Sequence, residues 1–325
     1  MVVASLFVAE GDLCRAQIST IPANGTNAVE IQRETWHDSK RDRDVPVKIY
    51  SPKSRDGPLP VIIFSHGLGG SRDGYEYLGR HWASRGYVTV HLQHLGSDDT
   101  VWRETGAPKR LEAMRQSAAN VQNSINRPRD VSFAIDELER LNREKSPWQH
   151  RLDLERIGVA GHSYGAFTAL AIAGQVFAPG LAMQDSVVDP RVKAAIPMSA
   201  PVPGNHRRLD ESYASVKIPC LHMTGTKDSS MIGDTKPEDR RLPYDHCRNS
   251  DQFLITFKDG DHMIFSGRVV RPGSRDKLFQ ALICDSTTAF WDAYLRSNLA
   301  KKAWLTNGFK SMLGDAGTFE MKLKE

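Results

Sequence analysis

Short apolar runs alternate with amphipathic stretches along most of the chain, and this alternation constrains the fold more than any other sequence feature. The runs have the length of strands buried on both faces and cover residues 60–64, 87–92, 156–160, 193–198, 218–223 and 253–257, the last predicted core strand. Apolar residues at helical spacing predict helices over residues 75–84, 130–142, 166–173 and 278–295. Strands that alternate with helices build a mostly parallel sheet covered on both faces. We therefore predict an α/β fold.

Three other segments depart from this alternation. Strands are predicted at residues 28–35 and 45–50, and the charged turn at residues 38–44 is typical of an antiparallel hairpin at a sheet edge. Residues 96–127 are polar and are predicted to form a long irregular connection. The tail after Lys301 predicts a short docking helix that carries Trp304, Phe309 and Leu313.

Length and composition are those of an ordinary globular protein. Of the 325 residues, 40% are hydrophobic and 25% charged, so the chain can bury a large core. We predict one domain over residues 1–325, with residues 1–25 as a poorly ordered extension. No apolar run approaches the length of a membrane span. Residues 1–9 match a signal peptide poorly, which favours the cytoplasm, whereas a truncated start would be compatible with a periplasmic or secreted protein.

Charge and cysteine content argue against two classes of function. The 43 basic and 39 acidic residues give a formal charge of +4, which is too small and dispersed for a nucleic-acid-binding surface. The cysteines form no C-x-x-C pair, so no metal site is predicted, and no organic cofactor is expected. We expect free buried thiols, with a bridge between Cys220 and Cys247 as the alternative; the other two cysteines are Cys14 and Cys284. The oligomeric state is not predicted.

Ser163 is the centre of the motif Gly-His-Ser-Tyr-Gly at residues 161–165. The motif follows a predicted strand and precedes a helix of small residues, which is the setting of a nucleophile elbow. Glycines are expected where side chains would collide with the neighbouring strand and helix, and a helix N-terminus favours developing negative charge. We predict that Ser163 is a catalytic nucleophile. The alternative is an ordinary turn in which the serine caps the helix.

A glycine-rich loop, His-Gly-Leu-Gly-Gly at residues 66–70, follows the strand predicted at residues 60–64. Where a nucleophile elbow is present, this loop supplies one amide to an oxyanion hole, and the residue after the nucleophile supplies the other. We therefore predict that the backbone N–H groups of Leu68 and Tyr164 bind the oxyanion. A glycine-rich turn without function is the alternative. His66 is predicted to order the loop rather than to act as a base.

Asp228 lies just after the strand predicted at residues 218–223, where a carboxylate can reach a histidine in the next loop. Its predicted role is to fix the imidazole tautomer and to stabilise the imidazolium. A lone aspartate in a loop is otherwise a turn former or a cap. Weaker competitors for this role are Asp185, Asp189 and Asp234.

His262 follows the last predicted core strand and is the predicted general base and acid. The order Ser163, Asp228, His262 is the order of triads that use this elbow. The adjacent Asp261 is expected to shape the turn. Three other histidines are not expected to be the base. His162 is predicted to have a structural role, His222 to lie within a strand and His246 to lie in a polar loop.

The motifs at residues 64–70 and 161–165 resemble those of the platelet-activating factor acetylhydrolase and dienelactone-hydrolase-like branch of the α/β-hydrolases. The region around His94 and the segment Asn-Arg-Pro-Arg-Asp-Val at residues 126–131 are also similar to that branch, and the resemblance covers about residues 45–295. It implies a serine esterase that cleaves short-acyl or otherwise accessible carboxylic esters through an acyl-serine intermediate. The substrate would be a small molecule, a lipid or a polyester.

Two departures from this branch narrow which of its members the chain is expected to resemble. Dienelactone hydrolases use a cysteine nucleophile, whereas position 163 is serine. Animal acetylhydrolases place their acid after the strand that corresponds to residues 193–198, where this chain has Ser199-Ala200-Pro201 and no carboxylate. The later position of Asp228 is similar to that in bacterial polyester- and cutinase-like hydrolases.

Substrate choice is expected to come from three segments at the carboxyl edge of the sheet. They are residues 96–127 with Trp102, residues 229–251 with Tyr244 and residues 263–275 with Phe265. The two longer segments are equally compatible with solvated surface excursions. Two other functions stay open, namely a peptidase or amidase that uses the same triad and a non-catalytic binding module with the same fold.

Overall fold

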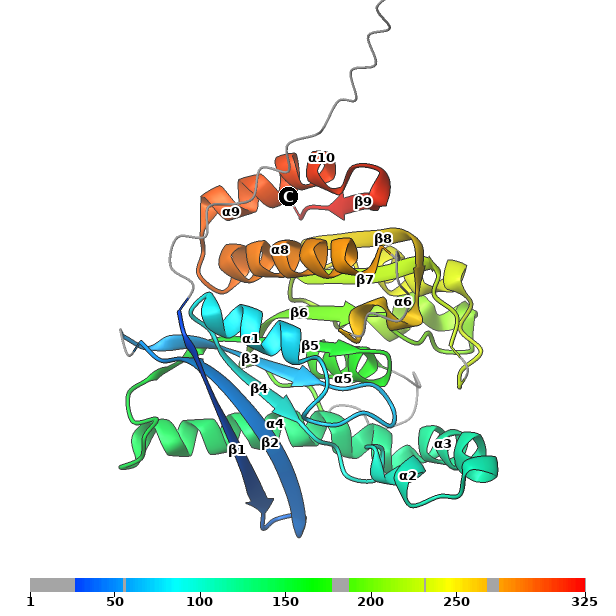
Figure 1. Ribbon diagram of the computed structural model, residues 1–325. Helices are drawn as coiled ribbons and strands as arrows, with labels where there is room; N and C mark the ends of the chain where they lie inside the picture. Colours follow the sequence, from blue (N-terminus) through cyan, green and yellow to red (C-terminus); the bar gives the residue numbers. More distant parts are fainter. Residues whose placement is uncertain (1–26, 55–56, 177–186, 231, 268–274, 325) are drawn as a thin grey trace, which may run out of the picture.

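The computed structural model describes residues 27–54, 57–176, 187–230, 232–267 and 275–324. These residues contain a nine-stranded sheet in the order β1-β2-β4-β3-β5-β6-β7-β8-β9 (Figure 1). Neighbouring strands from β4 to β8 in this order pair in parallel, whereas β1, β2 and β9 join antiparallel. The strands are β1 (Val29–Asp38), β2 (Arg43–Pro52), β3 (Leu59–Ser65), β4 (Val88–Leu92), β5 (Leu152–His162), β6 (Val192–Met198), β7 (Cys220–Lys227), β8 (Gln252–Asp261) and β9 (Gly317–Lys322). The predicted α/β fold with a mostly parallel sheet is confirmed.

Helices cover both faces of the sheet, as expected for a parallel sheet. One face packs against α4 and α5 and the other against α1 and α8 (Figure 1). In β3, Val61 and Ile63 face the first of these cores, and Ile62 and Phe64 face the second. The described helices are α1 (Glu76–Ser84), α2 (Thr100–Arg103), α3 (Arg110–Ala119), α4 (Val121–Arg143), α5 (Tyr164–Ala173), α6 (Leu209–Tyr213), α7 (Leu242–His246), α8 (Asp276–Tyr294), α9 (Leu299–Ala303) and α10 (Phe309–Leu313).

The predicted edge hairpin is present, and both of its strands are longer than predicted. β1 and β2 pair antiparallel over their whole lengths, from Val29 opposite Pro52 to Asp38 opposite Arg43. β1 is the outermost strand at this edge of the sheet. Charged residues in the turn leave an edge that pairs poorly with other chains.

The prediction of a long irregular connection at residues 96–127 is wrong, because this segment is largely helical. It contains α2, α3 and the first two turns of α4. The helix predicted at residues 130–142 begins at Val121 instead, where the side chain of Asn120 caps it. Pro128 lies inside α4, although proline disfavours a helical residue before it. The buried side chains of Asn123 and Arg127 outweigh that local preference.

The tail contains one strand that the sequence did not predict. β9 pairs antiparallel with β8, so the strand predicted over residues 253–257 is not the last of the sheet. Phe319 anchors β9 by stacking on Phe253 and meeting Phe309 edge-on. The expected docking helix is present as α9, a π-helical turn at Trp304–Gly308, and α10. Phe309 and Leu313 are buried in it.

The cysteines are free wherever the structure describes them. Cys220 and Cys247 are buried and unbridged, and Cys284 is partly exposed. The predicted free thiols are thus confirmed at Cys220 and Cys247, and the alternative bridge between them is not formed. Cys14 and the expected extension at residues 1–25 lie outside the described residues. Among the described helices, none combines the length and the apolar character that crossing a membrane requires.

Candidate active site

Ser163 lies on a strained turn between β5 and α5. Its φ of 56° and ψ of −118° are unusual for a residue with a side chain. The turn is held in place because the Ser163 amide donates to the Met198 carbonyl at 2.9 Å. A Cβ at Gly161 would overlap the backbone of Gly165, and a Cβ at Gly165 would overlap the Ser65 carbonyl. The flanking glycines are therefore sterically required, as the motif predicted.

Asp228 and His262 are brought together by the ends of β7 and β8. His262 Nδ1 lies 2.7 Å from Asp228 Oδ1. The carboxylate of Asp228 is fully buried, whereas the His262 side chain keeps 15% of its exposure. A carboxylate oxygen accepts, so Nδ1 carries the proton and Nε2 is left as the acceptor. This is the tautomer that a general base needs.

Three further groups hold the Asp228 carboxylate. Ser199 Oγ and Thr224 Oγ1 donate to Asp228 Oδ2 at 2.5 and 2.8 Å. The buried guanidinium of Arg240 lies 3.5 Å from Oδ1 and also donates to the backbone carbonyls of Ser199 and Ala200. Burial alone would raise the pKa of Asp228, but the His262 hydrogen bond and the Arg240 charge lower it to about 2. The acid is therefore ionised at neutral pH.

His162, next to the elbow serine, supports the backbone of His262. Its Nε2 lies 2.8 Å from the His262 carbonyl, and its Nδ1 lies 2.8 Å from the Tyr75 hydroxyl. The carbonyl can only accept, so Nε2 donates, and the neutral ring accepts from Tyr75. Burial holds the pKa of His162 well below its ordinary value. These contacts agree with the structural role predicted for this histidine.

The direction of the Leu68 amide follows from the carbonyl that precedes it. The Gly67 carbonyl accepts from His66 Nδ1 at 2.6 Å and from the Gly70 amide at 3.0 Å. Because a trans peptide is planar, the Leu68 N–H points away from those two donors. The loop of residues 66–70, called the glycine loop, is further held by Trp102 Nε1, which donates to the Gly69 carbonyl.

The Tyr164 amide is directed in the same way. The Ser163 carbonyl accepts from the amides of Ala166 and Phe167, so it points into α5. The Tyr164 N–H therefore points out of the helix N-terminus, where amides have no carbonyl partner within the helix. Tyr164 begins α5 directly after the elbow serine, and Leu68 of the glycine loop lines the same cavity as that serine.

His66 orders the glycine loop, as predicted, and is unsuited to act as a base. It donates to the Gly67 carbonyl, and its Nε2 accepts from the His94 amide at 3.1 Å. Burial, with a smaller contribution from the Arg127 charge, holds the pKa of His66 well below its ordinary value.

A cavity of about 640 Å³ opens over these groups. Ser163, His262 and Leu68 line it together with the apolar side chains of Trp102 and Met263. Acidic side chains also reach its wall, but each described one is paired with a base, as Asp99 is with Arg103. The cavity therefore presents a mixed surface to a substrate, in which apolar side chains lie beside polar groups and paired charges.

The three segments expected to select substrates contribute unequally. Trp102 of α2 lines the cavity, as expected. From residues 263–275, the cavity wall includes Met263, whereas Phe265 is buried against Phe257 and His162 in the core. No described residue of the segment 229–251 lines this cavity, and Tyr244 instead packs beneath the Lys322 ammonium. That segment instead reaches the Asp228 carboxylate through Arg240.

The competing aspartates and histidines lie elsewhere. Asp189 forms an ion pair with Arg191, Asp234 is exposed, and Asp185 lies outside the described residues. His222 binds Gln252, and Asp261 accepts from the Met263 amide and shapes the turn, as expected. His246 ends the short helix α7 rather than lying in a loop, and it pairs with Asp210.

Two buried arginines next to the site were missed by the sequence analysis. Arg240 supports the acid, and Arg127 lies behind the glycine loop. The only sequence signal for Arg127 was its position in the segment of residues 126–131, which resembled a known branch. Nothing in the sequence distinguished Arg240 from other charged residues of its segment.

The sheet and the serine elbow place this chain in the α/β-hydrolase class of serine hydrolases. It belongs to the family whose model is described as "Serine hydrolase (FSH1)", which matches residues 94–267, more than half of the chain. The model "Platelet-activating factor acetylhydrolase, isoform II" matches residues 35–102.

Individual relatives are distant and are matched only in part. Platelet-activating factor acetylhydrolase from Cavia porcellus is 26% identical over 153 residues, covering 39% of this chain and 34% of the relative. The same protein from Bos taurus is 24% identical over 34% of this chain and 31% of the relative. The same protein from Canis lupus familiaris is 24% identical over 38% of this chain and 34% of the relative. The chain spans about a third of the length of these curated relatives.

Proposed function

We propose that this protein hydrolyses accessible carboxylic esters with short acyl groups by transferring the acyl group to Ser163. The observation that carries the proposal is the 2.7 Å hydrogen bond between His262 Nδ1 and Asp228 Oδ1, beside a cavity that His262 and Ser163 both line. Similarity to acetylhydrolases supports a small acyl group. The apolar side chains of Leu68, Trp102 and Met263 within the mixed cavity wall support an ester with an apolar portion, such as a lipid.

In the first half of the reaction, His262 Nε2 takes the Ser163 hydroxyl proton while Oγ attacks the ester carbonyl carbon. The carbonyl oxygen becomes an oxyanion, which the N–H groups of Leu68 and Tyr164 bind. When the carbon–oxygen bond to the leaving group breaks, His262 returns the proton to the departing alcohol. The acyl group stays on Ser163.

In the second half, water attacks the acyl-serine, and His262 takes a proton from that water. The Ser163 oxygen leaves with a proton from His262, and the carboxylic acid is released. Asp228 stays ionised throughout because its pKa is about 2. Its charge stabilises the imidazolium that forms twice in each cycle.

The test combines covalent labelling with an acyl-length series. Wild type should react with a fluorophosphonate probe at Ser163 and should turn over p-nitrophenyl acetate or butyrate faster than long-chain esters. Aminoacyl p-nitroanilides, offered in parallel, report peptidase activity. Ser163→Ala should abolish both labelling and turnover and leave the circular dichroism spectrum unchanged. Ser84→Ala, at the far end of α1, is the matched control and should behave like wild type.

Two outcomes would overturn the proposal. Labelling and ester turnover that survive in Ser163→Ala would remove the serine from the mechanism. A folded wild type that fails to react with the probe would point to a non-catalytic binding module.

A further inference from the structure

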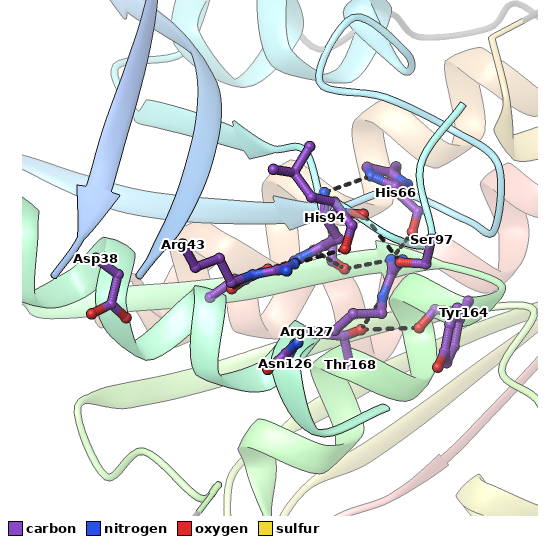
Figure 2. Close-up of polar contacts among 12 residues, drawn as sticks. Asp38, Arg43, His66, His94, Ser97, Asn126, Arg127, Tyr164 and Thr168 are labelled. Carbon is purple, nitrogen blue, oxygen red and sulfur yellow. Dashed lines mark hydrogen bonds and ion pairs between the residues drawn. The ribbon is translucent and has the colours of Figure 1, made fainter. Parts of the chain in front are cut away.

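A cluster of buried polar side chains fills the space behind the glycine loop, between β3, α4 and α5 (Figure 2). At its centre is Arg127 of α4, and around it lie His66, His94, Ser97 and Thr168, with Asp130 bound to His94 at 2.9 Å. Each of these residues is at most 1% exposed. Because buried polar groups are costly unless they are paired, such a cluster needs an explanation.

The Arg127 guanidinium uses every one of its nitrogens. Nε donates to Thr168 Oγ1 at 3.0 Å, and Nη1 donates to Ser97 Oγ at 2.8 Å. Nη2 donates to Ser65 Oγ at 3.1 Å and to the His66 carbonyl. The planar fork of arginine can bond in several fixed directions at once, which the single ammonium of lysine cannot reproduce.

One guanidinium thus contacts both segments that carry the proposed oxyanion amides. On the glycine loop it binds the His66 carbonyl, two residues before Leu68. On α5 its central carbon lies 4.5 Å from the Tyr164 ring centroid. Thr168 Oγ1, which accepts from Arg127, itself donates to the Tyr164 carbonyl at 3.0 Å. Figure 2 shows Arg127 between His66 on one side and Tyr164 on the other.

The charge of Arg127 has no carboxylate partner in contact. Asp130, the other fully buried charge of this cluster, pairs with Arg43 and Arg41 at 2.9 and 2.8 Å. Within the described residues, Arg127 forms no ion pair of 4.0 Å or less. Burial lowers the pKa of Arg127 to about 10, so it stays charged at neutral pH. Burial of an unpaired charge disfavours folding and suggests a function.

The neighbouring histidines do not compensate for this charge. Burial, with the Arg127 charge as the next cause, lowers the pKa of His94 to about 4 and that of His66 well below its ordinary value. Both rings are therefore neutral at pH 7. A positive charge without a contacting counterion remains behind the loop that faces the cavity.

We propose that Arg127 is a positioning residue of the oxyanion hole, which holds the His66 carbonyl and Tyr164 so that the Leu68 and Tyr164 amides face one oxygen. Its buried charge also favours the negative oxygen that forms there. The inference rests on the proposed ester hydrolysis at Ser163. It assigns to Arg127 a role in the transition state rather than in substrate binding.

The test compares Arg127→Met and Arg127→Lys with wild type in the full chain, with p-nitrophenyl acetate as substrate. We expect kcat to fall about 10- to 100-fold in Arg127→Met and less in Arg127→Lys, because loss of a direct oxyanion donor costs about 10²–10³-fold. KM should change by less than about threefold, as expected for an interaction made only in the transition state. The affinity for a trifluoromethyl ketone, which forms a tetrahedral oxyanion adduct with serine, should fall in parallel with kcat/KM.

Arg296→Met is the matched control. Arg296 donates to the Arg85 and Gly86 carbonyls and stacks over the Tyr87 ring at 4.0 Å, as Arg127 contacts a carbonyl and a ring, but it also pairs with Asp292 at 2.9 Å. These contacts lie at the amino end of β4, at the edge of the sheet opposite the cavity. Its loss should lower thermal stability and leave kcat and ketone affinity unchanged.

A second variant keeps the inference testable if Arg127→Met does not fold. Thr168→Val preserves shape but removes the hydroxyl that links Arg127 to Tyr164. We expect about a three- to tenfold loss of kcat at constant KM, in proportion to one lost hydrogen bond of about 1 kcal/mol.

The inference is overturned if folded Arg127→Met keeps kcat and ketone affinity within twofold of wild type. If that variant does not fold, unchanged kcat in both Arg127→Lys and Thr168→Val overturns it. If wild type labels with fluorophosphonate and these variants keep full kcat, only the role of Arg127 is refuted, and the proposed function stands. Wild type that neither labels nor hydrolyses esters refutes the proposed function, and the inference with it.

Discussion

The two halves of the candidate site each contain a buried arginine, but the two arginines have opposite surroundings. In the acid–base half, Arg240 lies 3.5 Å from the Asp228 carboxylate and helps to keep it ionised beside His262. In the oxyanion half, Arg127 contacts a carbonyl, hydroxyls and an aromatic ring, and no carboxylate among the described residues.

This difference matches the charges that ester hydrolysis would create. Proton transfer to His262 makes a cation, and attack on the ester makes an anion. The half that would host the cation contains a buried carboxylate, and the half that would host the anion contains a buried, unpaired guanidinium. Fixed charges of this kind act strongly because water is largely excluded from the protein around them.

The largest effect should come from the acid–base half. Asp228→Asn should lower kcat by about 10⁴-fold, because an amide at this position favours the wrong imidazole tautomer. Steady-state kinetics with p-nitrophenyl acetate measures the loss. Asp189→Asn is the control, since that carboxylate pairs with Arg191 away from the site. Equal activity of Asp228→Asn and wild type would place the acid elsewhere.

The two arginines should separate stability from catalysis. Arg240→Met leaves Asp228 without its buried cation and should lower the free energy of unfolding by about 3–5 kcal/mol. Arg127→Met leaves no carboxylate unpaired. It should therefore lower the free energy of unfolding less than Arg240→Met does, and lower kcat more. Urea unfolding and steady-state kinetics on both variants give the comparison. Similar losses in both quantities for both variants would remove the distinction between the halves.

A smaller effect is expected at Ser199. Ser199→Ala removes the donor that lies 2.5 Å from Asp228 Oδ2, so the pKa of Asp228 should rise toward its ordinary value. We expect about a three- to tenfold loss of kcat, the equivalent of one hydrogen bond of about 1 kcal/mol. Ser97→Ala removes a comparable hydroxyl in the other half and should lower kcat without changing the pKa of Asp228. NMR titration of the Asp228 carboxyl carbon distinguishes the two variants.

The last effect is on acid stability, to which His94 in the oxyanion half and Asp228 in the acid–base half should contribute at different pH. The pKa of His94 is lowered by burial from 6.5 to about 4, so the unfolded chain binds this proton and the folded chain does not between those values. Stability should therefore rise with pH between about 4 and 6.5, by at most about 1.4 kcal/mol per pH unit per histidine. His94→Asn should reduce this slope in urea titrations.

Asp228 acts in a lower window. Its pKa is about 2 in the folded protein, against an ordinary value of 3.8, so its stabilisation is present above about pH 4 and is lost as pH falls toward 2. Asp228→Asn should alter the stability profile only in that lower window. If Asp228→Asn changes the slope of stability with pH between about 4 and 6.5, or His94→Asn changes it below about 4, these groups are wrongly assigned.

The core of the fold was predictable because it depends on short-range patterns. In β3, Val61 and Ile62 face opposite cores, so the whole run must be apolar and is visible in the sequence. The ends of the helices were less predictable than their existence. The apolar spacing predicted a helix from residue 130, but α4 begins at Val121 and buries Asn123 and Arg127 in its first turns. A local propensity is a weak preference that tertiary packing overrides.

β9 shows the same limit at the other end of the chain. Its six residues carry no clear alternation, and their burial pattern is irregular. What holds the strand is its ladder with β8 and the packing of Phe319 against Phe253. Neither partner is near in sequence, so no window around residues 317–322 contains the signal.

The sequence by itself determined the alternation of strands and helices, the glycines around Ser163 and the chain order of Ser163, Asp228 and His262, because each is encoded in a few consecutive residues or in simple order. Tertiary structure alone decided how the charges around those residues are arranged. Arg127 and Arg240 reach the site from α4 and from the segment after β7, and they bind the carbonyls of His66 and Ser199, which are far away along the chain. Whether a buried guanidinium meets a carboxylate or a carbonyl depends on that folding, and its electrostatic effect depends on the water that folding excludes.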